Sequence, residues 1–263
     1  MSPVACFQAD IPEHTHNQTL LFLNWTHSLT YALSPSWQIS ASLPLQLRQI
    51  RISYFLLDET PYTPPYAGMH HRNEMLLGIG DPQLSISHIV WWNSWGIMPS
   101  LSTSIPLGKT EENPYLRASQ GLQHQHIQQG SGSFVPSVGI SLFRDETQWG
   151  MLHTITHSIP LYENSYQYKP GSNTRWSIGY WKRISPKIVF MPQVRGTHES
   201  SERWMDLPYG GQDAFGIILS SFIRVHKDWE LGIQLERNVW IRSRVSEEEP
   251  INPMMIWNIS ITR

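Results

Sequence analysis

Histidine is the residue type in this chain whose number and spacing suggest chemistry most directly. The 263 residues include twelve histidines, and two His-x-His pairs and one adjacent pair lie in polar stretches between apolar runs. In an extended segment, His-x-His places both rings on one side, and imidazole is a common ligand of Zn, Cu and Ni. The candidate metal ligands are therefore His14, His16, His70, His71, His124 and His126.

Two interpretations of these histidines stay open at this stage. The first is capture of Zn or Cu at one mouth of the fold, where the long loops meet. The second is that the imidazoles are uncharged polar loop residues that hydrogen-bond to neighbouring loops. Neither interpretation requires a resident cofactor.

The sequence contains no recognisable enzyme motif. It has no Gly-x-Ser-x-Gly elbow, P-loop, dinucleotide fingerprint or His-Glu-x-x-His. Its single cysteine, Cys6, excludes an internal disulfide and a CxxC zinc site. We therefore expect a protein that is not an enzyme.

The elements that must position these histidines are strands, because apolar and polar residues alternate over long stretches. From Leu21 to Leu33 the odd positions are mostly apolar and the even ones mostly polar, and after a "SPS" turn the pattern resumes from Trp37 to Leu47. Period-two alternation is typical of strands. Similar hairpins are predicted over 84–107, 134–161, 176–194 and 215–239, and a last strand over about 254–261.

The lengths of the predicted connections alternate in the same regular way. Turns within hairpins are short, whereas the connections over 56–73, 108–132, 162–172, 198–212 and 242–250 are long and polar. Short turns on one rim and long loops on the other are typical of an outer-membrane barrel. We therefore predict an all-β, up-and-down antiparallel transmembrane β-barrel of about 12 strands that forms a single domain over 1–263.

The N-terminal segment 1–17 is interpreted separately. Eleven strands are evident from the alternation, whereas single-chain bacterial barrels have an even number. The run from Val4 to Ile11 is the candidate for a short twelfth strand. The residues before it are hypothesised to be a signal-peptide remnant.

Composition favours a membrane barrel. Charged residues make up 15% of the chain, against about 25% in soluble domains, and the polar face of the first six strands carries mainly Ser, Thr, Gln, Asn and Gly. The net charge of −2 argues against nucleic-acid binding. Six tryptophans flank the short turns and predict an aromatic girdle, and they are Trp37, Trp92, Trp95, Trp149, Trp181 and Trp229.

In an alternative arrangement, the apolar face of the strands lines the interior and the polar face points outward. Four histidines share the side of the strands that carries the apolar residues: His27, His88, His153 and His157. If that side lines the interior, the chain is a soluble periplasmic β-barrel that binds a small ligand or metal in an apolar cavity. The strand face that lines the interior therefore separates the two hypotheses.

Three segments also carry a family resemblance. The stretches "GIGDPQLSISHIVW" from Gly78, "SWGIMPSLSTSIPLGK" to Lys109 and "GSGSFVPSVGISL" to Leu142 resemble transporters of the MetA-pathway-of-phenol-degradation type. The resemblance covers about 78–161. It implies a channel or uptake protein of the cell outer membrane for a small solute, hydrophobic or aromatic in character. The implied partners are membrane lipid, that solute and the outer-membrane assembly machinery.

Overall fold

The protein is an all-β structure with a single short helix in the part that is described. The computed structural model describes residues 11–65, 67–68, 73–125, 127–227, 229–243 and 255–262. The helix is α1 (Pro114–Ser119), which begins after the N-cap Asn113. Within those ranges, no helix is long and apolar enough to cross a membrane.

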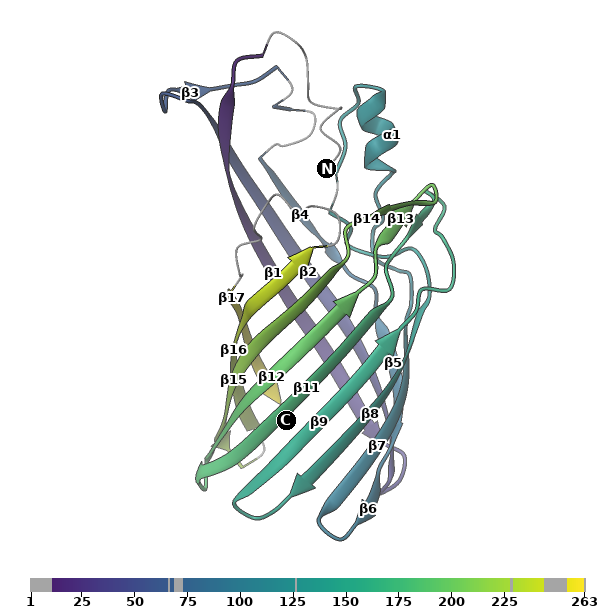
Figure 1. Cartoon of the computed structure of the whole chain (residues 1–263). Coiled ribbons are helices and arrows are strands. Elements are labelled where there is room, and N and C mark those ends of the chain that lie inside the picture. The colour runs from purple at the N-terminus through teal and green to yellow at the C-terminus, as the bar shows by residue number, and fades with distance from the viewer. Residues whose placement is uncertain are drawn as a thin grey trace.

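One large antiparallel sheet of 14 strands forms the body of the molecule and curls into the cylinder of Figure 1. Eleven strands follow one another along it. They are β1 (His14–Ala32), β2 (Trp37–Leu56), β5 (Gln83–His88), β7 (Trp95–Ser104), β8 (Val135–Asp145), β9 (Trp149–Ser158), β11 (Asn173–Ser185), β12 (Ile188–Glu199), β15 (Gln212–His226), β16 (Trp229–Ser243) and β17 (Met255–Thr262).

Smaller elements extend this sheet or lie in the long loops. β3 (Pro61–Tyr62) and β4 (Glu74–Ile79) pair with β2, and β6 (Val90–Trp92) pairs with β7. β10 (Tyr168–Lys169), β13 (Glu202–Trp204) and β14 (Leu207–Tyr209) form a separate three-stranded sheet. The short turns lie at one end of the cylinder, whereas α1 and this small sheet lie at the other (Figure 1).

The expectation of a closed barrel of about 12 strands needs correction. No ladder joins β1 to β17 among the described residues, so the sheet stays open there. Because all neighbours along the path of eleven strands are antiparallel, the first and last strands run in the same direction. Antiparallel closure would need one more strand, and the run proposed for it, Val4 to Ile11, falls almost entirely outside the described residues.

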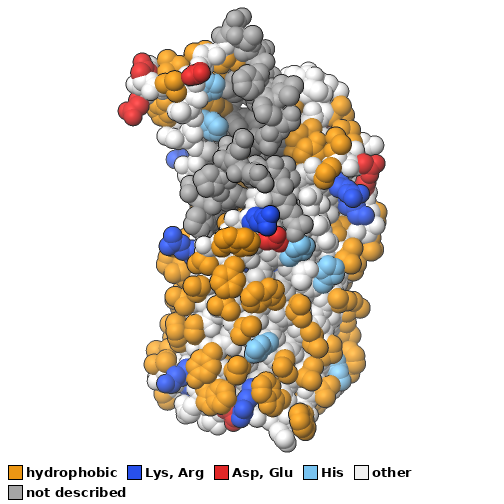
Figure 2. Space-filling model, in the orientation of Figure 1, with side chains coloured by type: hydrophobic (Ala, Val, Ile, Leu, Met, Phe, Trp, Pro, Cys, Tyr) orange, Lys and Arg blue, Asp and Glu red, His pale blue; other side chains and the backbone are white. Residues whose placement is uncertain are grey.

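The two faces of the sheet differ sharply in chemistry. The convex face carries the apolar set, including Leu29, Leu84 and Leu101, which are 74%, 47% and 55% exposed. Figure 2 shows hydrophobic side chains over much of the side of the cylinder that faces the viewer. The concave face carries the polar set. Gln38 on β2 reaches Met98 on β7 across the intervening β5, with 3.9 Å between Nε2 and Sδ, which is the convergence expected of side chains inside a curved sheet.

A β-bulge interrupts the alternation near the end of β16. Gly216 pairs with Asn238 but Phe215 pairs with Trp240, so Val239 is an extra residue on β16. A bulge of this kind bends the strand and redirects side chains. Asn238 on the near side of the bulge is buried, whereas Trp240 beyond it is 51% exposed.

Candidate functional site: the concave face and the loops above it

The concave face is lined by small uncharged polar side chains that bond to one another across strands. Thr154 and Ser177 lie 2.7 Å apart between Oγ1 and Oγ, and Gln83 donates from Nε2 to the Ser102 hydroxyl at 3.2 Å. Such groups can hydrogen-bond water or a polar solute without fixing a charge. This arrangement contradicts an apolar interior for the described strands.

The strongest polar contact of the concave face is an ion pair that crosses a strand. The Arg195 guanidinium on β12 pairs with the Glu236 carboxylate on β16 and donates to the Asn238 Oδ1 at 3.1 Å. β15 lies between them, and it presents Gly216 at this level. A Cβ atom there would approach the Asn238 Oδ1 to 3.0 Å, so the glycine leaves the crossing open.

Asp81 ties the loop between β7 and β8 to the end of β4. Its Oδ1 accepts a hydrogen bond from the Gly108 backbone amide at 2.9 Å. Its Oδ2 accepts from both the amide and the hydroxyl of Ser131 at 2.7 Å. One carboxylate therefore joins the beginning and the end of the loop that contains α1.

The same loop touches the concave face near its open end. The Gln125 side chain donates to the Glu74 carboxylate at 2.6 Å. The Gln129 amide lies over Gly78, where a Cβ atom would come within 2.2 Å of its Oε1. Because Gly78 pairs with Gln46 of the concave face, the loop covers part of the inner surface of β4.

An aromatic cluster joins α1 to the small sheet. Tyr115 of α1 stacks on Tyr209 of β14 with ring centroids 4.0 Å apart, and Tyr168 of β10 packs on Trp204, which is 2% exposed. The Tyr168 hydroxyl donates to the Glu202 carboxylate at 2.9 Å. We call the loop 105–134 and the small sheet together the loop cap.

Burial changes the acidity of the groups in this cluster. Desolvation raises the pKa of the Glu202 carboxyl, and the hydrogen bonds from Tyr168 and Trp204 only partly oppose that rise. Burial, reinforced by the charge of Glu202, raises the pKa of Tyr115 to about 12 and also raises the pKa of Tyr168. The loop cap therefore encloses a carboxyl group whose pKa lies above its ordinary value.

Three of the six predicted metal ligands, His14, His16 and His124, lie within the described residues, where each has other contacts. His14 and His16 lie on β1 beside tyrosine rings, with His14 5.4 Å from Tyr62 and His16 6.1 Å from Tyr54 between centroids. His124 is buried in the loop cap, with its Nδ1 3.0 Å from the Leu122 carbonyl oxygen. Among the residues that the structure describes, no group of three or more His, Cys, Asp or Glu is placed to hold a metal. The other three candidates, His70, His71 and His126, lie outside the described residues.

The four histidines of the apolar side lie on the convex face, and three of them have identifiable partners. His88 packs on Trp37 with 4.4 Å between ring centroids, and His27 stacks on Trp25 at 5.2 Å. The His157 Nδ1 lies 2.8 Å from the Thr174 hydroxyl. Aromatic or hydroxyl partners thus accommodate imidazole on a mainly apolar surface.

The aromatic residues near the short turns largely follow the prediction. Trp92 is 75% exposed, and the Arg144 guanidinium lies over Trp95 and Trp149 at 5.7 and 4.9 Å from the ring centroids. Trp181 is the exception, because its ring covers Gly150 on the concave side of the sheet. It therefore does not belong to the convex girdle.

The sequence analysis missed a second row of aromatic residues near the long loops. Directly paired residues on adjacent strands place Trp176, Gly196, Phe215 and Trp240 side by side on the convex face. The Trp176 ring occupies the space above Gly196, and its centroid lies 6.1 Å from that of Phe215. In the sequence, Trp176, Phe215 and Trp240 each lie a few residues from a long connection, and this placement could have predicted the row.

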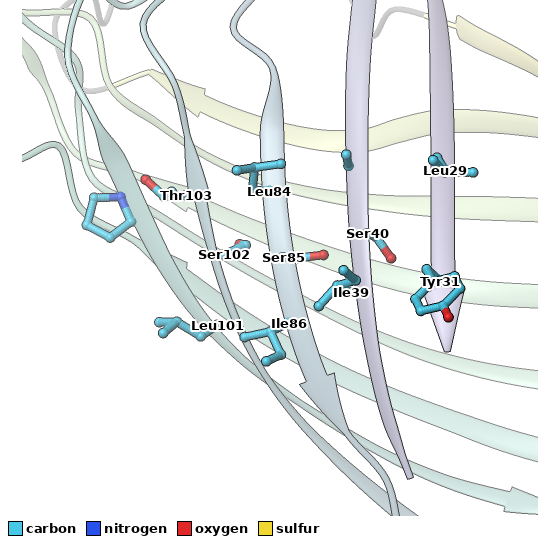
Figure 3. A pocket seen from close by; sticks show the side chains of 12 residues that line it. Leu29, Tyr31, Ile39, Ser40, Leu84, Ser85, Ile86, Leu101, Ser102 and Thr103 are labelled. Atoms are coloured by element: carbon cyan, nitrogen blue, oxygen red, sulfur yellow. The ribbon is translucent and has the colours of Figure 1, made fainter. Parts of the chain in front are cut away.

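A shallow hollow lies on the convex apolar surface. It has a volume of about 500 Å³ and is lined by residues of β1, β2, β5 and β7, such as Leu29, Ile39, Ile86 and Leu101 (Figure 3). Its lining is mainly apolar, with hydroxyl groups from Ser40, Ser85, Ser102 and Thr103, and it belongs to the same surface as the exposed apolar side chains.

Comparison with known proteins finds solved structures of similar fold, and an outer membrane channel is among them. An outer membrane channel from Pseudomonas putida F1 superposes with a TM-score of 0.60 at 8% sequence identity, and the match covers 94% of this chain and 82% of that chain. No protein-family model and no curated protein matches the sequence. The chain therefore has the fold of an outer membrane channel.

Proposed function

We propose that this protein is an outer-membrane channel of the MetA-pathway-of-phenol-degradation type that passively admits or binds a small solute, hydrophobic or aromatic in character. The apolar convex face would contact lipid, and the polar concave face would contact water and solute. The outer-membrane assembly machinery would insert it. The fold of the channel from Pseudomonas putida F1 supports this proposal.

The observation that carries the proposal is the separation of chemistry between the two faces. Large apolar side chains are exposed on the convex face, including Trp25 at 68% and Leu77 at 75%. Exposed apolar surface on that scale is unfavourable in water and typical of a lipid-facing barrel. A concave face rich in hydroxyl and amide groups is suited to passage of solutes.

The loop cap is the feature that would control entry. It rests on the inner surface of β4 through Gln129 and is fastened by the three hydrogen bonds to Asp81. Replacing Asp81 with Ala removes both acceptor oxygens and with them all three hydrogen bonds. The loop cap should then detach from β4 and widen the entrance.

The test is permeation into liposomes that contain the purified full-length chain. We expect a small aromatic acid to enter faster than into protein-free liposomes, and faster again with Asp81→Ala. The matched control is Asp58→Ala, because Asp58 also accepts a loop backbone hydrogen bond, from Thr60 at 3.0 Å, without holding the loop cap. Asp58→Ala should permeate like the unchanged protein.

Two results would contradict the proposal. A protein that is monodisperse without detergent would not be a membrane barrel. Liposomes containing inserted protein that admit no more solute than empty ones, with or without Asp81→Ala, would exclude a channel.

A further inference from the structure

A row of polar side chains crosses the convex face on five adjacent strands. The strand pairings place His157 opposite Thr174, Thr174 opposite His198, His198 opposite Asp213, and Asp213 opposite Arg242. We call these five residues the outer polar row. They come from β9, β11, β12, β15 and β16, so the row can exist only when all five strands are in register.

Hydrogen bonds between neighbouring strands fix the imidazoles of this row. The His157 Nδ1 lies 2.8 Å from the Thr174 hydroxyl, and the His198 Nδ1 lies 2.7 Å from the Asp213 carboxylate. Both rings use Nδ1 for these contacts, and the His198 side chain is 53% exposed. The row therefore holds both imidazole rings in fixed orientations on the convex face.

Arg242 adds a permanent positive charge at one end of the row. Within the described residues it forms no ion pair, although Asp213 lies opposite it. The bulge at Val239 keeps Arg242 and Trp240 on the convex face. A guanidinium in this position can donate two parallel hydrogen bonds to a phosphate group.

The row lies directly beyond the aromatic row of Trp176, Phe215 and Trp240. Moving two residues along each strand leads from aromatic side chains to polar ones. In Figure 2, basic, acidic and histidine side chains form an oblique line along the upper edge of the hydrophobic surface. Aromatic residues followed by polar residues is the order expected where lipid tails give way to headgroups.

A second group of cations lies on the same strand pair further from the hydrophobic surface. β10 and β13 continue the β11–β12 hairpin, because the Ser200 amide donates to the Ser172 carbonyl oxygen at 2.9 Å. Beyond this link, Lys169 pairs directly with Arg203. Like charges placed opposite each other repel, and a bound anion would relieve that repulsion.

We propose that the outer polar row binds the phosphate group of a membrane lipid whose tails lie along the hydrophobic surface below, and that the Lys169–Arg203 pair adds positive charge further from the membrane. This inference rests on the proposed membrane location. The lipid would be held by its headgroup on the β9–β16 side of the molecule. Five residues separate the two cation levels on the strand pair, a span of at most about 17 Å that a lipid headgroup of extended shape can bridge.

The test uses two lipids that differ only in the phosphate. The detergent-solubilised full-length chain is titrated with dioleoyl phosphatidic acid or with dioleoylglycerol, and bound lipid is counted by native mass spectrometry. We expect the phosphate-bearing lipid to bind at least about tenfold more tightly, since each basic group near a lipid surface contributes about a fivefold preference. The variant Arg242→Gln, His198→Gln, His157→Gln should reduce the preference to about twofold.

Matched control variants test whether lipid binding depends on this site or on any basic residue of the protein. Arg51→Gln and His153→Gln remove an exposed arginine of β2 and a histidine of β9 that lies outside the outer polar row, and we expect both to keep the preference. Lys169→Gln with Arg203→Gln should lower it by a smaller factor than the triple variant. A full loss of preference in the control variants would overturn the proposal.

Other outcomes distinguish a lipid phosphate from inorganic phosphate. They also distinguish failure of the lipid site from failure of the proposed channel function. Equal binding of the two lipids, or complete displacement of phosphatidic acid by millimolar inorganic phosphate, would overturn a lipid site. If the chain inserts into liposomes and admits solute but shows no phosphate preference, the inference fails and the proposed function stands. If it does not insert at all, both fail.

Discussion

β12 contributes one residue to an ion pair on each face of the sheet, and the two pairs differ in burial. On the concave face, Arg195 reaches across β15 to Glu236, whose side chain is only 7% exposed. On the convex face, His198 contacts Asp213 directly, with side chains 53% and 30% exposed. In the buried pair, Arg195 and Glu236 therefore depend on each other to compensate their charges. In the exposed pair, His198 and Asp213 can each contact water or a lipid headgroup instead.

Two glycines allow the two arrangements on opposite faces. Gly216 leaves room for Arg195 to cross to β16, and Gly196 leaves room for the Trp176 ring to lie beside Phe215. They lie in consecutive residue pairs of the β12–β15 ladder, because Gly216 is paired with Arg195 and Gly196 is paired with Phe215. The difference teaches that β12 takes part in a buried charged contact with β16 inside and in an exposed polar contact with β15 outside.

The largest effect is expected from breaking the inner pair. Glu236→Leu leaves Arg195 without its carboxylate and should lower the free energy of unfolding by about 3 kcal/mol. The double variant Arg195→Met, Glu236→Leu should recover most of that loss, because it removes both charges. Urea unfolding in detergent, followed by the gel mobility of the folded barrel, measures both. Equal destabilisation by the single and double variants would show that the pairing itself contributes nothing.

A smaller loss is expected when the aromatic row beside the outer pair is disturbed. In Gly196→Ala, the new Cβ would come within 2.3 Å of the Trp176 ring and must displace it. We expect a loss of about 2 kcal/mol in the free energy of unfolding and a change in tryptophan fluorescence. Gly68→Ala is the control, since nothing lies within 4 Å of its Cβ position. Matching stabilities for the two variants would contradict the packing described for Trp176.

Glu202 adds a third carboxyl group to the comparison, and burial disfavours its ionised form. Its pKa in the folded protein is raised by burial, so its contribution to the stability of the loop cap is full below the unfolded pKa of about 4.3 and is lost as pH rises through the folded pKa. Hydrogen-exchange protection of 202–209, corrected for intrinsic rates, should therefore fall as pH rises from 4 to 8. Glu202→Gln should abolish that dependence, and a variant with an unchanged slope would assign it to another group.

The smallest effect is expected from the outer pair. Asp213→Asn removes the charge that faces His198 but leaves an exposed hydrogen-bond acceptor in place. Exposed pairs contribute about 0–1 kcal/mol, so unfolding in urea should change by less than about 1 kcal/mol. A loss as large as that of Glu236→Leu would mean that the two pairs are equivalent after all.

The strands could be predicted because alternation is local. The run from Leu21 to Leu33 and the run from Trp37 to Leu47 correspond to β1 and β2, although both strands extend further toward the long loops. The expected last strand, about 254–261, corresponds to β17 at Met255–Thr262. The pattern also separates the two faces correctly, but it carries no information on whether β1 and β17 meet.

The site could be predicted less well, because it depends on which residues pair across strands. His14 and His16 pack near Tyr54, and the His124 Nδ1 lies beside the Leu122 carbonyl oxygen, and spacing within a loop could not reveal these contacts. The outer polar row is built from residues of five strands. Only the register of each hairpin brings such residues together, and turn length by itself does not fix it.

The bulge at Val239 changes which residues of β16 face outward. Before the bulge, the odd-numbered residues Leu235 and Arg237 face outward, and beyond it the even-numbered Trp240 and Arg242 do so. The extra residue therefore shifts the phase of the alternation by one. A strand without this phase shift would point Trp240 and Arg242 into the interior beside Ala214, so a single inserted residue decides which compartment their side chains enter.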